Sequence, residues 1–434
     1  MNKEEILSKR NAYVYPTKVP YYKDPLHLVR AKGSYVYDDK GQEYLDVIGG
    51  IVSISVGHNH PRIVERMKGM LSEDAIQHTT YLYLSEYMAE LAEKLVSFLP
   101  DRDRKCYFTN SGSEANEMAI MTAREATGQQ MVVALRHGYH GGTNVPLSLC
   151  GHATWKYPNQ PQASVVHAKA PYCYRCPYGK TKESCGLECA EDVKEVIETA
   201  TSGKVAAAII EPILGVGGFV DAPVEYHKRV YDIIKSFGGL YISDEVQTGV
   251  GRTGANFFAI RDSGVDPDIV SMAKGIGNGA PVGAIVAKSK YAEALKGKLH
   301  FNTFGGDPYQ AMQASEVVDI VMDESLIENA HQMGTYLHSG MKELQKDFPI
   351  IGDIRGRGLM IGLELVKDQT SKEVAASETA LLMEYAKDEK LLIGKGGLYG
   401  NVVRIAPSLA ITKEECDQLI TRLRKAFIKL KNAN

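Results

Sequence analysis

The feature that most constrains the fold of this chain is a set of short apolar runs that alternate with helical patterns. Each run is four to six residues long and is apolar at neighbouring positions rather than at every second one. Strands of this kind are buried on both faces, as in a largely parallel sheet covered by helices. The runs cover residues 106–109, 131–135, 205–210, 240–243 and 269–272. The pattern therefore predicts an α/β protein with a mostly parallel central sheet.

The two ends of the chain predict a second, smaller domain. Residues 34–38 and 43–47 alternate like strands around a turn at 39–41. Periodicity predicts a helix at 84–98, helices near 311–345 and 374–390, and strands near 359–366 and 402–405. We expect residues 61–320 to form a large domain, and residues 1–60 and 321–434 to form a small α+β domain from both chain ends.

Charge and hydropathy exclude several classes of protein. The 50 Lys and Arg residues nearly balance the 53 Asp and Glu residues, so no basic face is expected for nucleic acid or an anionic membrane surface. The most apolar stretch, 205–220, contains Glu211 and Pro212, which argues against a membrane span. Because the start, MNKEEILSKR, is polar, we expect no signal peptide and a cytoplasmic enzyme.

Polar residues follow three of the predicted strands at the edge where such sheets bind ligands. Asp244 and Lys274 each follow a run, and residues 111–113, Ser-Gly-Ser, begin a helix after a third run. A helix N-terminus binds phosphate, a strand-end lysine forms a Schiff base with an aldehyde, and a buried aspartate keeps a pyridine nitrogen protonated. Each feature alone is more often a helix cap or a loop charge. Together they predict pyridoxal 5′-phosphate (PLP) as cofactor.

Several long motifs resemble the class III PLP-dependent aminotransferases, whose fold is the PLP-dependent transferase fold type I. The resemblance runs from about residue 20 to about residue 425. It rests on NSGSEANEMA (110–119), EPILG (211–215), ISDEVQTGVGRTG (242–254), SMAKGIGNG (271–279) and NTFGGDP (302–308). Within this family the chain most resembles the alanine–glyoxylate aminotransferase 2 branch. The segments that carry this resemblance are GIVSISVGHNHP (50–61), HFNTFGGDP (300–308) and GDIRGRGLMIGLEL (352–365).

The resemblance implies a role for each residue around the cofactor ring. Lys274 would be the Schiff-base lysine and proton shuttle, and Asp244 would pair with the pyridinium nitrogen. Val246 would pack on one face of the ring and Tyr139 on the other, and Gln247 would hydrogen-bond the ring hydroxyl.

The resemblance also implies a phosphate site that is shared across a homodimer. Ser111, Gly112 and Ser113 would bind the phosphate, joined by Thr303 from the partner subunit. His140, within HGYHGG (137–142), is interpreted as a structural residue or as one that binds the cofactor. A metal site is disfavoured, since no carboxylate accompanies the histidines at metalloenzyme spacing.

Arg404, in VVRIAPS (402–408), matches the arginine that binds the substrate α-carboxylate in this family. Many members that act on ω-amines have EPIQGE, whose last glutamate can pair with that arginine. Here EPILGV (211–216) places Val216 at that position, so our hypothesis is that Arg404 has no carboxylate gate. This favours small α-amino and 2-oxo acids such as alanine, pyruvate and glyoxylate. The sequence does not decide whether Glu211 has a role near the cofactor or is only a charged residue at the end of a strand.

The predicted reaction is transamination between a small amino acid and a 2-oxo acid. One alternative is a PLP-dependent lyase that acts on an amino-alcohol phosphate, since it would use the same lysine and aspartate. A second alternative is an ω-amino acid or diamine transaminase. A non-enzymatic regulatory protein is disfavoured, because Lys274, Asp244 and Arg404 are all present and no DNA-binding segment is attached.

Four of the seven cysteines fall in one loop-like insertion at 171–190. They are Cys173, Cys176, Cys185 and Cys189. Four thiols at this spacing are compatible with a structural zinc ion, although the outer separations are not those of a zinc ribbon. The alternatives are free thiols, or two disulfides in an oxidising compartment.

Overall fold

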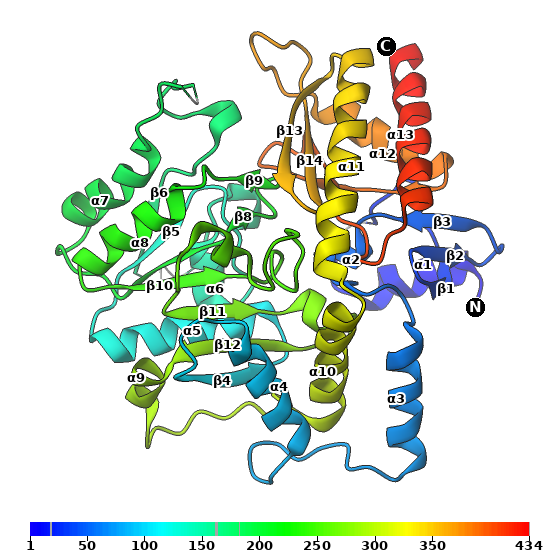
Figure 1. Cartoon of the computed structure of the whole chain (residues 1–434). Helices are drawn as coiled ribbons and strands as arrows, with labels where there is room; N and C mark the ends of the chain where they lie inside the picture. Colours follow the sequence, from blue (N-terminus) through cyan, green and yellow to red (C-terminus); the bar gives the residue numbers. More distant parts are fainter. Residues whose placement is uncertain (18–19, 161–163, 182, 434) are drawn as a thin grey trace.

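The computed structural model describes residues 1–17, 20–160, 164–181 and 183–433, and its centre is a seven-stranded sheet (Figure 1). The strand order is β4-β12-β11-β10-β7-β5-β6, and β12 is antiparallel to both of its neighbours whereas the other strands share one direction. The strands are β4 (Arg104–Thr109), β5 (Val132–Leu135), β6 (Val165–Ala168), β7 (Ala207–Ile210), β10 (Leu240–Asp244), β11 (Ile269–Met272) and β12 (Gly283–Lys288). The prediction of a mostly parallel central sheet is confirmed.

All five predicted apolar runs are strands of this sheet, but the sequence analysis missed β6 and β12. In β12 the ladder pairs Ile285 with Ser271 of β11 and with Tyr107 of β4. The strand therefore fills the space between two strands that come from distant parts of the chain.

Consecutive residues of the central strands are buried in different layers, which explains their unbroken apolar character. Ala208 and Tyr241 belong to the cluster that contains α8 (Tyr226–Ser236), whereas Ile209 and Ile242 belong to the cluster that contains α5 (Gly112–Thr127). The other helices of this region are α3 (Pro61–Ser72), α4 (Glu86–Ser97), α6 (Asn144–Leu149), α7 (Glu188–Ala200) and α9 (Ser289–Ala292). The helix predicted at 84–98 is α4.

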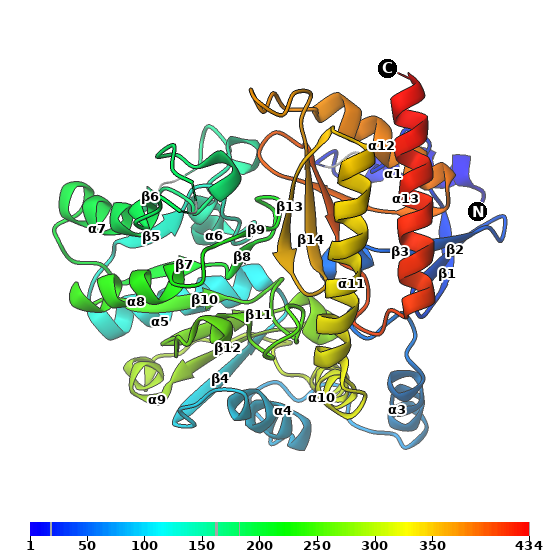
Figure 2. The same cartoon turned by 45° about the horizontal axis from the view of Figure 1, so that its top comes forward.

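Two four-stranded sheets flank the central sheet (Figure 2). The first has the order β1-β2-β3-β15 and joins the N-terminal hairpin to a strand near the C-terminus. The second has the order β13-β14-β17-β16. Their strands are β1 (Leu28–Lys32), β2 (Tyr35–Asp38), β3 (Glu43–Asp46), β13 (Ile351–Arg357), β14 (Met360–Leu365), β15 (Leu391–Leu392), β16 (Gly394–Gly396) and β17 (Val402–Ile405). The predicted hairpin at 34–47 is β2 and β3.

The smaller sheets are contacted by α11 (Leu326–Asp347), α12 (Ala376–Asp388) and α13 (Lys413–Ala433), whereas α10 (Pro308–Asp323) packs against α3 and α4. The helical region predicted near 311–345 is two helices, which are separated at Ser325, a residue with a left-handed φ of 54°. The helices are α1 (Lys3–Tyr13), α2 (Gly49–Val52), α10 (Pro308–Asp323), α11 (Leu326–Asp347), α12 (Ala376–Asp388) and α13 (Lys413–Ala433). A short hairpin of β8 (Ile213–Leu214) and β9 (Val220–Asp221) completes the elements around the site. The domain limits at residues 60 and 320 stay a prediction.

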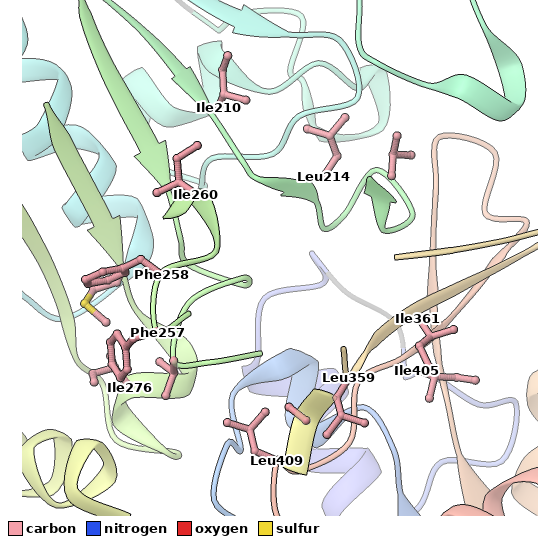
Figure 3. Close-up of a cluster of buried hydrophobic side chains, with 14 of the residues drawn as sticks. Ile210, Leu214, Phe257, Phe258, Ile260, Ile276, Leu359, Ile361, Ile405 and Leu409 are labelled. Atoms are coloured by element: carbon pink, nitrogen blue, oxygen red, sulfur yellow. The ribbon is translucent and has the colours of Figure 1, made fainter. Parts of the chain in front are cut away.

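One hydrophobic core connects the central sheet to the C-terminal sheet (Figure 3). It contains Ile210 and Ile260 on one side and Ile361 and Ile405 on the other. The backbones also approach closely, since a Cβ at Gly358 would lie 2.5 Å from the carbonyl carbon of Thr253. The two regions are therefore packed without space for a side chain at this point. Among the described residues no helix is long and apolar enough to cross a membrane.

Candidate active site

A cavity of about 350 Å³ lies at the carboxyl ends of the central strands. Nine of the residues predicted to bind the cofactor line it. They are Ser111, Gly112, Ser113, Tyr139, His140, Asp244, Val246, Gln247 and Lys274. Asp244, Lys274 and the helix start at 111–113, which the strand-end reasoning placed at one edge, therefore lie around one cavity. Tyr139, His140, Val246 and Gln247, which that reasoning did not place, line it as well.

Asp244 is the last residue of β10 and is 2% exposed. Its Oδ2 accepts hydrogen bonds from His140 Nδ1 at 2.7 Å and from Asn116 Nδ2 at 2.8 Å, and its Oδ1 accepts one from the Val246 N–H at 3.1 Å. Asn116 is itself fixed, because its Oδ1 accepts a hydrogen bond from Ser271 Oγ. The carboxylate is thus held in one orientation inside the cavity.

His140 is buried beside this carboxylate. Burial alone would lower the pKa of the imidazole, but the hydrogen bond and charge of Asp244 raise it above its ordinary value. The contact with Asp244 therefore favours the protonated form of His140.

Lys274 follows β11 and begins the short 3₁₀ helix η4 (Lys274–Gly277) with a left-handed φ of 51°. The loop behind it is fixed by Asn278, whose Oδ1 accepts the N–H groups of Ser55 and Val56 at 2.8 and 3.0 Å. A Cβ at Gly275 would lie 2.4 Å from Ser55 Oγ, so a larger residue here would require the Ser55 side chain to rotate. The lysine is therefore presented to the cavity by a backbone that is held from both sides.

The start of α5 forms a cradle suited to a phosphate group. Ser111 caps the helix by accepting the N–H of Glu114, and Ser113 Oγ accepts the N–H of Gly142 at 3.0 Å. A Cβ at Gly112 would lie 2.9 Å from Val246 Cγ1, so glycine keeps the helix start open against that side chain. Backbone N–H groups at a helix N-terminus attract anions, and this one is 16 residues long.

Gln247 supplies a direct test of whether the residues fit the predicted cofactor. Its Oε1 is buried and has no hydrogen-bond partner among the described residues, although the side chain lines the cavity. A buried acceptor of this kind is expected to meet a donor. The ring hydroxyl of PLP supplies one, so the residues fit the group.

The structure resolves the position of Glu211, which the sequence analysis left undecided. It lines the cavity and is 4% exposed. Its two oxygens accept the N–H of Tyr139 at 2.9 Å and the N–H of Gly215 at 2.8 Å. Burial raises the pKa of this carboxyl group, and the nearby charge of Asp244 raises it further. Glu211 thus fixes the loop that carries Tyr139.

Arg404 lies on β17, outside the residues that line the cavity, and is 4% exposed. Its Nε donates to the Lys395 carbonyl at 3.2 Å and its Nη1 donates to the Gly215 carbonyl at 3.4 Å. No ion pair joins it to a carboxylate anywhere in the described ranges, which agrees with the hypothesis of no gate at Val216. Burial lowers the pKa of its guanidinium, and Tyr21 and the more distant charge of Glu211 offset this only in part.

Thr303 is exposed and does not line the cavity of its own chain. Its role at the partner's phosphate therefore stays a prediction.

The cysteine insertion holds its four thiols near one another. Burial, followed by the charges of Cys185, Cys173 and Cys176, raises the pKa of Cys189 to about 12. In the part of the chain that the structure describes, no group of three or more His, Cys, Asp or Glu side chains is arranged to hold a metal ion. Residue 182 of the insertion lies outside the described residues. The zinc site stays a prediction.

Asn116 is the functional residue that the sequence analysis missed. It sits on the buried face of α5 with Ala115 and Ala119, where an amide is out of place in an apolar stripe. A buried amide among apolar residues requires hydrogen-bond partners, and this is the sequence signal that could have identified Asn116.

Comparison with known proteins shows which protein family this chain is similar to. Residues 18–427 match the family model for class III aminotransferases. Alanine–glyoxylate aminotransferase 2 homolog 2 of Arabidopsis thaliana is 42% identical over 98% of this chain and 87% of its own length. Leucine/methionine racemase of Thermococcus litoralis is 35% identical over 98% of this chain and 96% of its own length. An amine transaminase from an uncultivated Pseudomonas species, solved in its PLP-bound form, is 29% identical, with a TM-score of 0.89 over 96% of this chain and 98% of its own.

Proposed function

Because this chain belongs to the class III aminotransferase family, we propose that it moves the amino group of L-alanine, or of a similar small amino acid, to glyoxylate or pyruvate. PLP-dependent transamination itself follows from the family and its relatives. The observation that carries the choice of substrate is Arg404, a buried guanidinium without a carboxylate partner in the described ranges. Such a cation is suited to a substrate carboxylate in both half-reactions.

When bound, PLP supplies an electron sink for the charge that develops at the substrate α-carbon. Lys274 would hold the cofactor and, once released by the donor amine, its Nζ would move the proton from the α-carbon. Asp244 would keep the ring nitrogen protonated, with its own carboxylate oriented by His140 and Asn116.

The remaining cavity residues would fix the position of the cofactor. Ser111, Gly112 and Ser113 would bind the phosphate, Gln247 would accept the ring hydroxyl, and the ring would lie between Val246 and Tyr139. Glu211 would maintain the position of Tyr139 through its backbone hydrogen bond. Preorganised groups of this kind cost no rearrangement at the moment of reaction.

The proposal includes a homodimer. Two segments that expose large apolar side chains are in contact, because the His78 ring lies 5.2 Å from the Phe304 ring and its Nδ1 is 2.5 Å from Asp307. Thr303 belongs to the second of these segments and would reach the partner's phosphate site. The exposed side chains are Ile76, Leu82, Tyr83, Leu84, Leu299, Phe301 and Phe304. An exposed apolar area of this extent is typical of a protein interface.

For the cysteine insertion we propose a structural zinc ion. The support is the spacing of the four thiols and their effect on the pKa of Cys189. Binding would require the thiols to move together, because they do not form a ligand set as placed. The test is a metal assay on protein purified without chelator, and the absence of near-stoichiometric zinc contradicts the proposal.

The test of the proposed function is a donor–acceptor screen that follows the absorbance of the bound cofactor. We expect L-alanine to convert the cofactor, and glyoxylate or pyruvate to restore it. Two outcomes contradict the proposal: release of ammonia without an acceptor, which is lyase chemistry, and inversion of an amino acid without net transfer, which is racemisation.

A further inference from the structure

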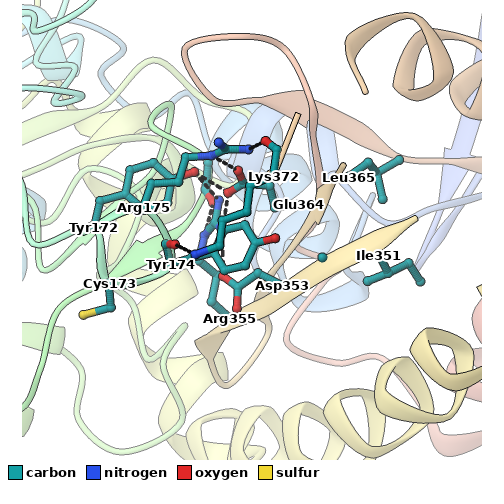
Figure 4. Close-up of polar contacts among 12 residues, drawn as sticks. Tyr172, Cys173, Tyr174, Arg175, Ile351, Asp353, Arg355, Glu364, Leu365 and Lys372 are labelled. Carbon is teal, nitrogen blue, oxygen red and sulfur yellow. Dashed lines mark hydrogen bonds and ion pairs between the residues drawn. The ribbon is translucent and has the colours of Figure 1, made fainter. Parts of the chain in front are cut away.

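A network of buried ionic hydrogen bonds connects the cysteine insertion to the sheet that carries Arg404 (Figure 4). Its centre is Glu364 of β14, whose side chain has no exposed surface. The carboxylate accepts hydrogen bonds from the Tyr172 hydroxyl, from Arg175 Nε and from Arg355 Nη1 at 2.7 Å. Two of these three donors come from the insertion.

The charges of this network are balanced. Burial alone would raise the pKa of Glu364, but Arg355, Tyr172 and Arg175 hold it below its ordinary value. Asp353 accepts a second hydrogen bond from Arg355 Nη1 at 2.8 Å, so two guanidinium groups face two carboxylates. Removing one member leaves an uncompensated buried group, and the rest of the network must then shift.

From Glu364 the network reaches Arg404 by two routes. The first is the sheet, because β14 pairs with β17 in a register that places Gly362 opposite Arg404 and Glu364 opposite Val402. The second is the hairpin around 213–221, where the Gly218 carbonyl accepts Arg355 Nε at 2.9 Å. Gly215, three residues before Gly218 in the same hairpin, supplies the carbonyl that accepts a hydrogen bond from Arg404 Nη1.

Tyr172 also contacts the cofactor side of the site. Its ring lies 5.4 Å from the ring of His137, at an interplanar angle of 89°. His137 has a left-handed φ of 68° and lies two residues before Tyr139. The same tyrosine therefore touches the cofactor loop through its ring and the Arg404 sheet through its hydroxyl.

We propose that Tyr172 and Arg175 are positioning residues that set Arg404 for the substrate carboxylate, so that the insertion acts as a brace between the cofactor loop and the carboxylate site. This inference rests on the proposed role of Arg404. Neither residue lines the cofactor cavity, and Tyr172→Phe keeps the ring that contacts His137. The effect of removing the hydroxyl or the guanidinium should therefore appear in the use of carboxylate substrates and not in cofactor binding.

The test is a double-mutant cycle on the holoenzyme with pyruvate as acceptor. Tyr172→Phe and Arg175→Ala are each measured alone and in an Arg404→Ala background, by kcat/KM and by the absorbance and affinity of bound PLP. We expect each variant to lower kcat/KM by about three- to tenfold in the parent background, with no further loss in the Arg404→Ala background. PLP affinity stays unchanged. Arg175→Lys, which keeps the charge, should recover part of the loss.

The matched control is Arg229→Ala, which removes an exposed ion pair with Glu191 next to the insertion and should have no effect. If Arg175→Ala fails to fold, Tyr172→Phe decides the question, because it removes only a hydroxyl. Equal losses of kcat/KM in both backgrounds, or no loss in the parent background, contradict the proposed positioning role of Tyr172 and Arg175. If Arg404→Ala itself leaves kcat/KM unchanged, the proposed carboxylate site fails and the inference fails with it.

Discussion

Gly396→Ala is a substitution that should displace Arg404 while leaving the fold intact. A Cβ at Gly396 would lie 2.7 Å from Arg404 Cδ and 2.9 Å from its Nε. Carbon atoms in contact need about 3.5 to 4.0 Å, so the arginine must move by about 1 Å. The two closest clashes are with the arginine side chain, which can yield more easily than the β16–β17 ladder. The Val216 carbonyl oxygen would lie 3.2 Å from the same Cβ and must also shift by a few tenths of an ångström.

The magnitude follows from that displacement. A misplacement of about 1 Å at a substrate-positioning group costs up to about 100-fold in rate, so we expect the KM for pyruvate or glyoxylate to rise by about 10- to 100-fold. Because the largest displacement falls on a side chain, the free energy of unfolding should fall by about 1 to 3 kcal/mol.

The assay is steady-state kinetics with pyruvate and glyoxylate, together with urea unfolding. Gly69→Ala is the matched control, because its nearest neighbour beyond the helix is 3.9 Å away, at a side-chain oxygen of Glu73. A KM for Gly396→Ala within twofold of the parent, in a folded protein with normal PLP content, would refute the assignment of Arg404 to the substrate carboxylate.

Three further predictions concern the site. Val216→Glu should raise the KM for pyruvate about tenfold by pairing with Arg404, whereas Val216→Gln should leave it nearly unchanged; equal effects of the two variants contradict this. Because the pKa of His140 is raised above 6.5 in the folded chain, its contribution to stability is present below about pH 6.5 and is lost as the pH rises through the folded pKa. The free energy of unfolding, measured in urea from pH 6 to 9, should therefore decrease less steeply with pH for His140→Asn than for the parent. Gly112→Ala, whose Cβ would lie 2.9 Å from Val246, should weaken PLP binding in a titration of the cofactor-free enzyme.

The sequence was sufficient to predict five of the seven strands of the central sheet, because their apolar runs are short-range patterns. Nine of the ten residues predicted to bind the cofactor line one cavity, although several of them were predicted only from the family resemblance. Asp244 and Lys274 stand directly after apolar runs, and one rule about parallel sheets places them at the same edge. The antiparallel strand β12 was not found, because its only signal is a short apolar stretch after Ala280 and Pro281. Its position between β4 and β11 is set by pairing with strands from other parts of the chain.

The connections between elements could not be predicted, because they depend on tertiary contacts without a periodic signal. Arg175 and Glu364 are separated by 189 positions, and their hydrogen bond forms only when the insertion lies on β14. Glu211 shows the same limit: the residue was noticed at a strand end, but its bond to Tyr139 spans 72 positions. In both cases the partners of a buried charge are known only from the fold.

The most direct test of the account is a single half-reaction with L-alanine and no acceptor, on holoenzyme and on Lys274→Ala. We expect the parent to form one pyruvate per bound PLP, to release no ammonia, to convert the cofactor to its aminated form, and to regain its original absorbance on addition of glyoxylate. Lys274→Ala should bind PLP but support no turnover. Continued product formation without an acceptor, or normal turnover by Lys274→Ala, would contradict transamination by this lysine.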